Sequence, residues 1–270
     1  MKNLLIKTLL ISFLLAVFSC TTEDNNDPSY NTRVLLKSIT YSGGAIYEYY
    51  ENNKCQYDIF DKYQYDTKGR LSKATNPSNS NSYDTYFYNE DGTIKTIYYY
   101  SSSTTYTRYE FLYSTNNIQA NIYSSTNPNV ISSRLNFLLT NGRISSYNQV
   151  GTVGTVNFTY DTNGNILSKI ASGYSQSAAN FSISSTFDNK FSPMALKLKG
   201  FFGESYLNNS ILAGIFDSEM QVNNFLTKRS IFSTSSFIYS FTYSYNAQNY
   251  PLSRTDNNGN KLFYNYDFSK

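Results

Sequence analysis

The sequence predicts an all-β protein: a large antiparallel meander of repeated β-hairpins that forms a curved sheet or an open or closed barrel. Three observations support this fold class. A short unit of a tyrosine, a turn closed by glycine and an aliphatic residue recurs along most of the chain. Before each turn, large aromatic and small polar residues alternate, as in a strand with one apolar face. The 28 tyrosines among 270 residues suit a thin sheet with partly wet faces, because tyrosine combines an apolar ring with a polar tip.

The repeat is clearest at residues 160–167, which read YDTNGNIL. Its Asp can accept a hydrogen bond from the backbone two residues on, and its Gly tolerates the positive φ of a tight turn. Each copy therefore predicts a hairpin tip. Six further stretches share this layout and are, in chain order, YDTKGRL at 65–71, YNEDGTI at 88–94, YSTNNI at 113–118, LTNGRI at 139–144, and the more worn FDNKF from Phe187 and YNAQNYPL at 245–252.

The spacing of the copies indicates how the hairpins connect. From Tyr65 to Phe187 they are 21 to 27 residues apart, a length that two strands and two connections fill. Asn141 and Gly142 fit a two-residue turn. In a meander, the tips must lie at one rim and the longer Ser- and Asn-rich connections at the other. These connections are predicted at 76–82, 124–129 and 171–179.

Residues 1–19 predict an export signal. Lys2 and Lys7 give a positive start, and residues 4–18 form an almost continuous apolar run. This run is shorter than the roughly 20 residues of a membrane-spanning helix, which favours a cleaved signal peptide.

The signal ends in VFSC, with the small Ser19 directly before Cys20. This resembles the lipobox of bacterial lipoproteins, and the resemblance implies that Cys20 is lipidated and becomes the mature N-terminus. A plain secretory signal cut near Cys20 is the alternative. Residues 20–32 then form a polar tether, and 33–270 a single β-hairpin repeat domain. The acidic Glu23 and Asp24 are similar to the surface-export signal of Bacteroidota lipoproteins. The alternative is that they belong to a solvated linker with no export role.

Composition excludes several classes of activity. The chain has 22 basic and 19 acidic residues, and 20 basic residues remain without Lys2 and Lys7 of the export signal. Positive and negative charges therefore nearly balance. Because nucleic-acid binding needs a strongly basic surface, no nucleic-acid partner is expected. The absence of histidine excludes imidazole catalysis and His metal sites. With Cys20 lipidated, Cys55 has no partner and is predicted to be a small buried residue. We expect no cofactor and no metal.

Two parts of the chain depart from the regular array. Residues 190–229 break the pattern, and here either a degraded copy around Phe216 or a short helix is expected. The pattern returns from 231 to 270, where DNNGN at 256–260 predicts a turn and a C-terminal strand is expected to finish the sheet.

The copies at 65–71 and 160–166 resemble the YD repeats of the RHS family, whose hairpins wind into a shell. RHS proteins are much longer and carry a C-terminal cargo, so their toxin role is not expected here. A lipobox followed by Tyr-rich hairpins resembles the uncharacterised Bacteroidota lipoproteins with a porin-like antiparallel sheet. That resemblance implies a fold and an envelope location and no chemistry.

Candidate sites are few. Asp161, Asn163 and Asn165 alternate as in a calcium loop, but Gly164 is misplaced and position twelve is Ser172, so turn chemistry explains them better. A glycan hydrolase would need a carboxylate pair. The nominal candidates are Glu48, Glu51, Glu110 and Glu204.

The sequence therefore predicts a lipid-anchored protein of the cell envelope, at the outer membrane and facing either the cell surface or the periplasm. It predicts a non-catalytic binding or structural module. Its membrane contact would be the lipid at Cys20. A glycan, an apolar ligand or a protein would bind at the loop rim. A carrier of an apolar ligand inside a curled sheet is the first alternative, which an apolar-lined cavity would favour. An envelope glycan hydrolase is the second, which two carboxylates facing each other across a cleft would favour.

Overall fold

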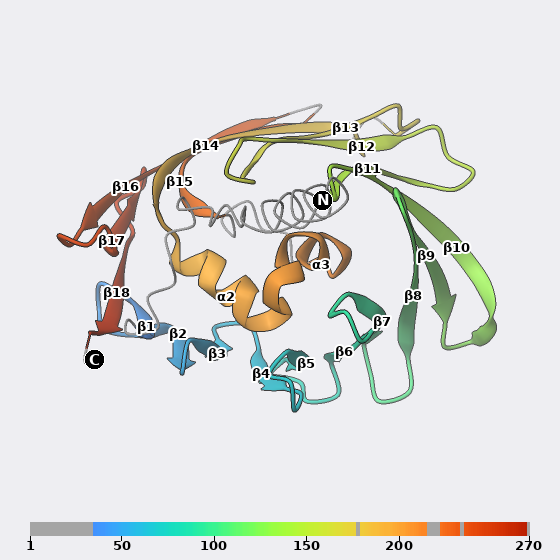
Figure 1. Cartoon of the computed structure of the whole chain (residues 1–270), viewed down its shortest axis with the longest axis horizontal. Coiled ribbons are helices and arrows are strands. Elements are labelled where there is room, and N and C mark those ends of the chain that lie inside the picture. Colours follow the sequence, from blue (N-terminus) through green and yellow to red (C-terminus); the bar gives the residue numbers. More distant parts are fainter. Residues whose placement is uncertain (1–34, 177–178, 215–221, 233–234, 269–270) are drawn as a thin grey trace, which may run out of the picture.

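The computed structural model describes residues 35–176, 179–214, 222–232 and 235–268. Within them, 18 antiparallel strands form one closed barrel (Figure 1). Each strand pairs with the next in the chain, and β18 (Lys261–Asp267) pairs with β1 (Leu35–Tyr41). The predicted meander is confirmed, and it takes the closed form, in which every strand has two neighbours. The predicted signal peptide at 1–19 and the tether at 20–32 lie outside the described residues.

In the described part of the chain, helical segments follow one of the strands: α2 (Pro193–Phe202), the short 3₁₀ segment η2 (Gly203–Ser205) and α3 (Tyr206–Leu212). The other strands are β2 (Ile46–Glu51), β3 (Lys54–Asp58), β4 (Lys62–Tyr65), β5 (Leu71–Thr75), β6 (Tyr83–Tyr88), β7 (Ile94–Tyr100), β8 (Tyr106–Ser114), β9 (Asn117–Ser124), β10 (Asn127–Thr140), β11 (Arg143–Gln149), β12 (Thr155–Tyr160), β13 (Ile166–Ser172), β14 (Phe181–Phe191), β15 (Asn223–Phe232), β16 (Ser236–Tyr245) and β17 (Pro251–Asp256).

The inner face of the barrel is mainly apolar, and its outer face carries exposed polar side chains with scattered apolar ones between them. In β16, Phe241 is buried, whereas its neighbours Ser240 and Thr242 are exposed, as the alternation of strand side chains requires. Hydroxyl pairs link neighbouring strands on the outside, for example the side chains of Thr159 and Ser168, 2.7 Å apart. The inner face supplies the core, with almost fully buried side chains at Leu36, Ile39, Tyr50, Leu71, Ile94, Ile97, Ile118 and Ile144.

The predicted hairpin tips share one hydrogen-bond pattern. In the tip at 161–165, the Asp161 N–H donates to the Asn165 carbonyl at 2.9 Å, and the Gly164 N–H donates back to the Asp161 carbonyl at 3.2 Å. Gly164 has a φ of 96°, which favours glycine. The same pattern closes the chain at 66–70, 89–93, 246–250 and 256–260, which confirms these predicted turns. Asn141 and Gly142 both have positive φ, as a two-residue hairpin turn requires.

The tyrosines of three repeats join one tip to the preceding one. Each hydroxyl donates to the carbonyl of the aliphatic residue that restarts the chain after the preceding turn. These bonds run from Tyr88 to Leu71 at 2.7 Å, from Tyr113 to Ile94 at 2.6 Å and from Tyr160 to Ile144 at 2.6 Å. The guanidinium of Arg70 also lies over the ring of Tyr88, 4.3 Å from its centroid. The repeat therefore carries its own contacts between successive hairpins.

The prediction of a tip at Phe187 is wrong. The FDNKF stretch lies within β14, and the chain continues into the helical segments before it returns as β15. The side chain of Asp188 still accepts backbone hydrogen bonds, as the Asp of a hairpin tip does. Its Oδ1 accepts from the backbone N–H of Lys190 at 2.9 Å and from that of Asn224 at 3.1 Å. An insertion has thus opened this turn. The alternative of a short helix is confirmed, whereas Phe216 lies outside the described residues.

The inserted helices lie inside the ring of strands (Figure 1). Ser192 caps α2, because its hydroxyl accepts from the Ala195 N–H at 3.3 Å, and Pro193 fits the first turn of the helix. Most of α2 is buried, including Leu198 and Phe201, as expected for a helix surrounded by an apolar wall. Among the described helices, none combines the length and apolar character needed to cross a membrane.

Two asparagines of α3 bind the helix to two hairpin tips. Asn209 accepts from the Ile94 N–H at 3.3 Å and donates to the Gly92 carbonyl at 3.0 Å. Asn208 makes the equivalent pair of bonds with Ile144 and Gly142, at 3.1 and 2.7 Å. We call the end of the barrel that carries these tips the tip rim, and the opposite end the loop rim. The insertion therefore occupies the tip-rim end of the lumen.

Candidate functional site

The barrel encloses a cavity of about 420 Å³ on the loop-rim side of α3. Strands β7, β8 and β10 to β13 supply its wall, and the end of α3 supplies its floor. Most of the lining side chains are aromatic or aliphatic, and one is a lysine. The lining residues are Tyr99, Tyr109, Phe111, Leu135, Phe137, Tyr147, Phe158, Lys169, Ile211, Leu212, Ala213 and Gly214.

The aromatic wall is held by ring contacts between neighbouring strands. Tyr99 and Tyr109 meet edge to face, with ring centroids 5.4 Å apart, and Tyr147 lies between Phe137 and Phe158 at 5.3 and 6.0 Å. Such contacts restrict the rings to a few orientations. The wall is therefore largely preformed, as small-molecule sites usually are.

The floor of the cavity is fixed by a hydrogen bond. The Tyr99 hydroxyl donates to the Ala213 carbonyl at 2.7 Å, at the C-terminal end of α3. Burial and the nearby charge of Asp84 raise the pKa of Tyr99 well above its usual value, so the hydroxyl stays a donor. Tyr99 therefore connects the wall to the insertion.

Lys169 is the charged residue of the cavity lining among the described residues. Its ammonium lies 5.4 Å from the ring centroid of Phe181 and 6.0 Å from that of Phe158. Burial lowers its pKa, and the positive charge of Lys228 lowers it further. The cavity wall thus carries a positive charge in an apolar setting.

The inner wall continues beyond the cavity toward the loop rim. On β15 and β16, Phe232, Phe237 and Tyr239 lie in phase with residues that face the core, yet they are 37%, 48% and 41% exposed. Large inward aromatic side chains that remain this exposed mark an open part of the lumen. The lumen is therefore filled near the tip rim and open near the loop rim.

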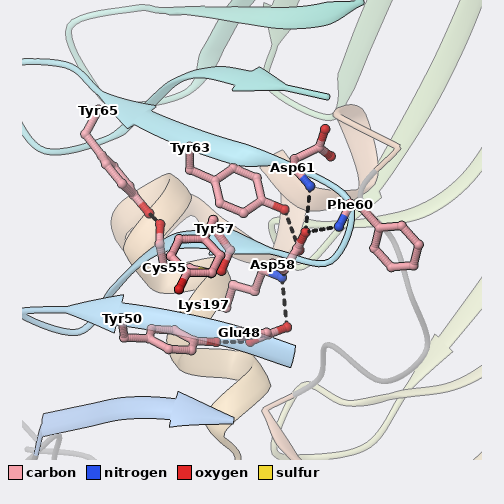
Figure 2. A network of polar contacts seen from close by, with 10 residues as sticks. All are labelled: Glu48, Tyr50, Cys55, Tyr57, Asp58, Phe60, Asp61, Tyr63, Tyr65 and Lys197. Atoms are coloured by element: carbon pink, nitrogen blue, oxygen red, sulfur yellow. Dashed lines mark hydrogen bonds and ion pairs between the residues drawn. The ribbon is translucent and has the colours of Figure 1, made fainter. Parts of the chain in front are cut away.

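A second cluster of charged residues anchors α2 to the wall. Figure 2 shows Lys197 between Glu48 and Asp58, which lie directly opposite each other on β2 and β3. The Lys197 Nζ is 2.9 Å from Glu48 Oε1 and 2.7 Å from Asp58 Oδ2. The hydroxyls of Tyr50 and Tyr63 donate to Glu48 and Asp58, respectively. All three charged side chains are at most 6% exposed.

The electrostatics of this cluster favour an ion pair. Burial opposes the charge on Lys197, but the carboxylate of Glu48 and further negative neighbours outweigh burial and hold the Lys197 pKa well above its usual value. Burial acts similarly on Asp58, and Lys197 outweighs it, so that the Asp58 pKa is lowered. Two carboxylates opposite each other would repel without the lysine. The cluster therefore attaches the insertion to the barrel.

The nominal hydrolase residues do not come together. Glu48 belongs to the buried cluster and Glu51 is exposed at the end of the same strand. Glu110 lies on the outer wall, where its Oε1 is 3.2 Å from Arg108 Nε, and Glu204 belongs to η2. None of the three described side chains faces another of them across a cleft.

The remaining predicted residues have structural roles where the structure describes them. Cys55 is buried, as predicted, and burial raises the pKa of its thiol. Asp161 uses both carboxylate oxygens within its tip, since they accept from the N–H and the side-chain amide of Asn165. This confirms turn chemistry there. Cys20 lies outside the described residues.

The position of the cavity and the roles of Lys169 and Lys197 were not predicted from the sequence. Lys169 precedes the buried Ala171 by two residues, a phase that places a lysine on the inner face and could have indicated it. Lys197 had no such signal, because its partners Glu48 and Asp58 lie about 150 and 140 residues away in the chain.

Similarity to known proteins is found at the level of structure alone. No protein-family model matches the chain, and no curated protein matches it. A crystal structure of a porin-like protein from Bacteroides vulgatus is similar, with a TM-score of 0.43 and 8% identity, over 86% of this chain and 98% of that one. A porin-like protein from Bacteroides uniformis gives a TM-score of 0.28 and 14% identity, over 76% and 89% of the two chains.

Proposed function

We propose that this protein is a lipid-anchored protein of the bacterial cell envelope and that its barrel is a non-catalytic module that binds a small apolar molecule. The aromatic-lined cavity beside α3 is the observation that carries this proposal. Its volume lies within the range of about 300–1,000 Å³ that is usual for small-molecule sites. A cavity of this kind favours a carrier over a structural module with a filled interior.

The outer wall supports a position beside the membrane. A membrane-spanning barrel presents an outward apolar band about 25 Å tall to the lipid. Here hydroxyl pairs such as Thr186 and Thr227, whose side-chain oxygens are 2.6 Å apart, lie on the outside. The export signal and Cys20 would supply the membrane contact instead.

The topology favours one orientation. The tether at 20–32 leads to β1, whose first residue, Leu35, pairs with Asp267 at the tip rim. The rim that the insertion occupies would therefore face the membrane, and the open loop rim would face away. A ligand would then enter the lumen from the aqueous side.

Cys20→Ala tests the anchor. We expect the variant to leave the membrane fraction for the soluble fraction, because the only acyl attachment point would be lost. Protease treatment of intact cells would separate a surface position from a periplasmic one. Membrane retention of the variant would contradict lipidation.

Leu135→Trp tests the binding site. Its side chain lines the cavity, and a larger ring there would fill space that a ligand needs. We expect the affinity for N-phenyl-1-naphthylamine, an apolar dye whose fluorescence increases in apolar sites, to fall about tenfold or more. Leu138→Trp is the matched control, because Leu138 lies on the same strand and is 52% exposed on the outside. Equal dye binding by both variants and the wild type would contradict the proposed site.

A further inference from the structure

We infer that the ligand of the lumen is an amphipathic anion, whose negative group lies at Lys169 and Lys228 while its apolar part packs on the aromatic wall. This inference rests on the proposed function and names its ligand class. It depends on where the two lysines lie, what surrounds them and which surface continues from them.

The two lysines lie on the same inner surface, with one strand between them. Lys169 on β13 pairs with Ile183 of β14, and Lys228 on β15 pairs with Ser185 of the same strand. Lys169 lines the cavity, and Lys228 is in phase with the buried Ser230 two residues on. Both ammonium groups therefore belong to one part of the lumen wall.

The surroundings of these lysines favour a negative partner. Lys169 lies among the rings of Phe158 and Phe181, and Lys228 acts on it as a like charge. Burial and repulsion both disfavour the charged form of Lys169. A carboxylate or phosphate placed between the lysines would offset both effects, whereas a cationic ligand would increase the repulsion.

The wall around the lysines offers both polar and apolar contacts. Ser185 and Ser230 add buried hydroxyl groups to the inner surface of β14 and β15. Toward the loop rim, the exposed rings of Phe232 and Phe237 extend an apolar surface from the same strands. An anion with a hydrocarbon part would use both surfaces, because its charged head group would bind at the lysines and hydroxyl groups and its apolar tail would pack on the neighbouring rings.

Calorimetric titration with decanoate, decanol and acetate tests the inference on the full domain. We expect decanoate to bind about tenfold more tightly than decanol, since a hydrogen-bonded charge contributes at least this much. Acetate should bind far more weakly, because it lacks the apolar part. Equal affinities for decanoate and decanol, or for decanoate and acetate, would overturn the inference and leave the proposed function intact.

Lys169→Met and Lys228→Met assign the effect to these lysines. We expect the double variant to lose the preference for decanoate while its affinity for decanol is retained, which shows that its lumen is still folded. Lys95→Met is the matched control, because Lys95 is exposed on β7 outside the cavity. A preference for decanoate that survives in the double variant would contradict the assignment. Failure of the wild type to bind decanoate, decanol or the dye would instead overturn the proposed function.

Discussion

Lys197 shows how one residue positions the insertion inside the barrel. A lysine with 2% exposure would normally be costly, but two carboxylates and their tyrosine partners surround it. The pair of carboxylates is equally dependent on the lysine. The three residues therefore stabilise the fold as a unit, and removing one partner would leave unpaired charge in the core.

Lys197→Met should lower the free energy of unfolding at pH 7 by about 3–5 kcal/mol, because Glu48 and Asp58 would remain buried without a cation. Urea denaturation would measure this loss. Lys95→Met should change it by less than about 0.5 kcal/mol, as expected for an exposed side chain. A loss below about 1 kcal/mol for Lys197→Met would show that the cluster does not stabilise the fold as described.

The pKa shifts predict where in pH this stabilisation holds. The Asp58 pKa is lowered on folding, so its contribution is present above the unfolded value of about 4 and is lost as pH falls through the folded value. The Lys197 pKa is raised, so its contribution is present below the unfolded value of about 10.4 and is lost as pH rises through the folded value. The difference between wild type and Lys197→Met should therefore be largest between about pH 4 and 10.

At the level of elements, the hairpin repeat carries both its turn and its link to the preceding hairpin. The tyrosine hydroxyl satisfies a backbone carbonyl near the start of the preceding strand, and a basic residue packs on its ring. This explains why tyrosine, rather than phenylalanine, precedes most of the tips. Each such repeat thus forms a turn and also contacts the preceding hairpin.

Tyr88→Phe should destabilise the protein by about 1–2 kcal/mol, because the half-buried carbonyl of Leu71 would lose its partner. Thermal and urea denaturation would both detect this change. Tyr100→Phe is the matched control, since its ring stacks on Tyr83 and is only half-buried. Equal effects of the two substitutions would show that the hydroxyl of Tyr88 contributes nothing.

The hairpin tips were predictable from the sequence because their bonds are local. Asp161 and Gly164 close a turn that involves only five residues. Asp188 looked the same in the sequence, yet its second partner, Asn224, lies 36 residues further on. Local composition therefore predicts that a turn side chain is present and does not reveal whether the chain continues into an insertion.

At the level of the whole molecule, the all-β meander was predictable and its closure was not. Closure depends on the pairing of Leu36 with Tyr266 and its neighbours, across 230 residues of chain. The cavity likewise needs residues from six strands and the end of α3 to assemble. A short stretch of sequence predicts neither the closure nor the cavity, because both depend on the pairing of distant strands and on the curvature of the barrel.

The closed barrel also explains why the protein tolerates lysines and exposed rings in its lumen. Lysines and partly exposed rings contribute less to stability than closely packed apolar side chains would, a cost that functional sites commonly carry. A ligand that binds only the folded barrel would raise the free energy of unfolding with the logarithm of its concentration relative to its dissociation constant. The lumen is thus the part of the fold that packing alone does not explain.

Photo-crosslinking with a diazirine analogue of decanoate, mapped by peptide mass spectrometry, tests this account most directly. We expect labels on inward side chains of β7 to β16 and α3, including positions near Lys169 and Phe237, and competition by unlabelled decanoate. Labels confined to the outer wall, or an unlabelled lumen under saturating probe, would contradict a ligand site inside the barrel.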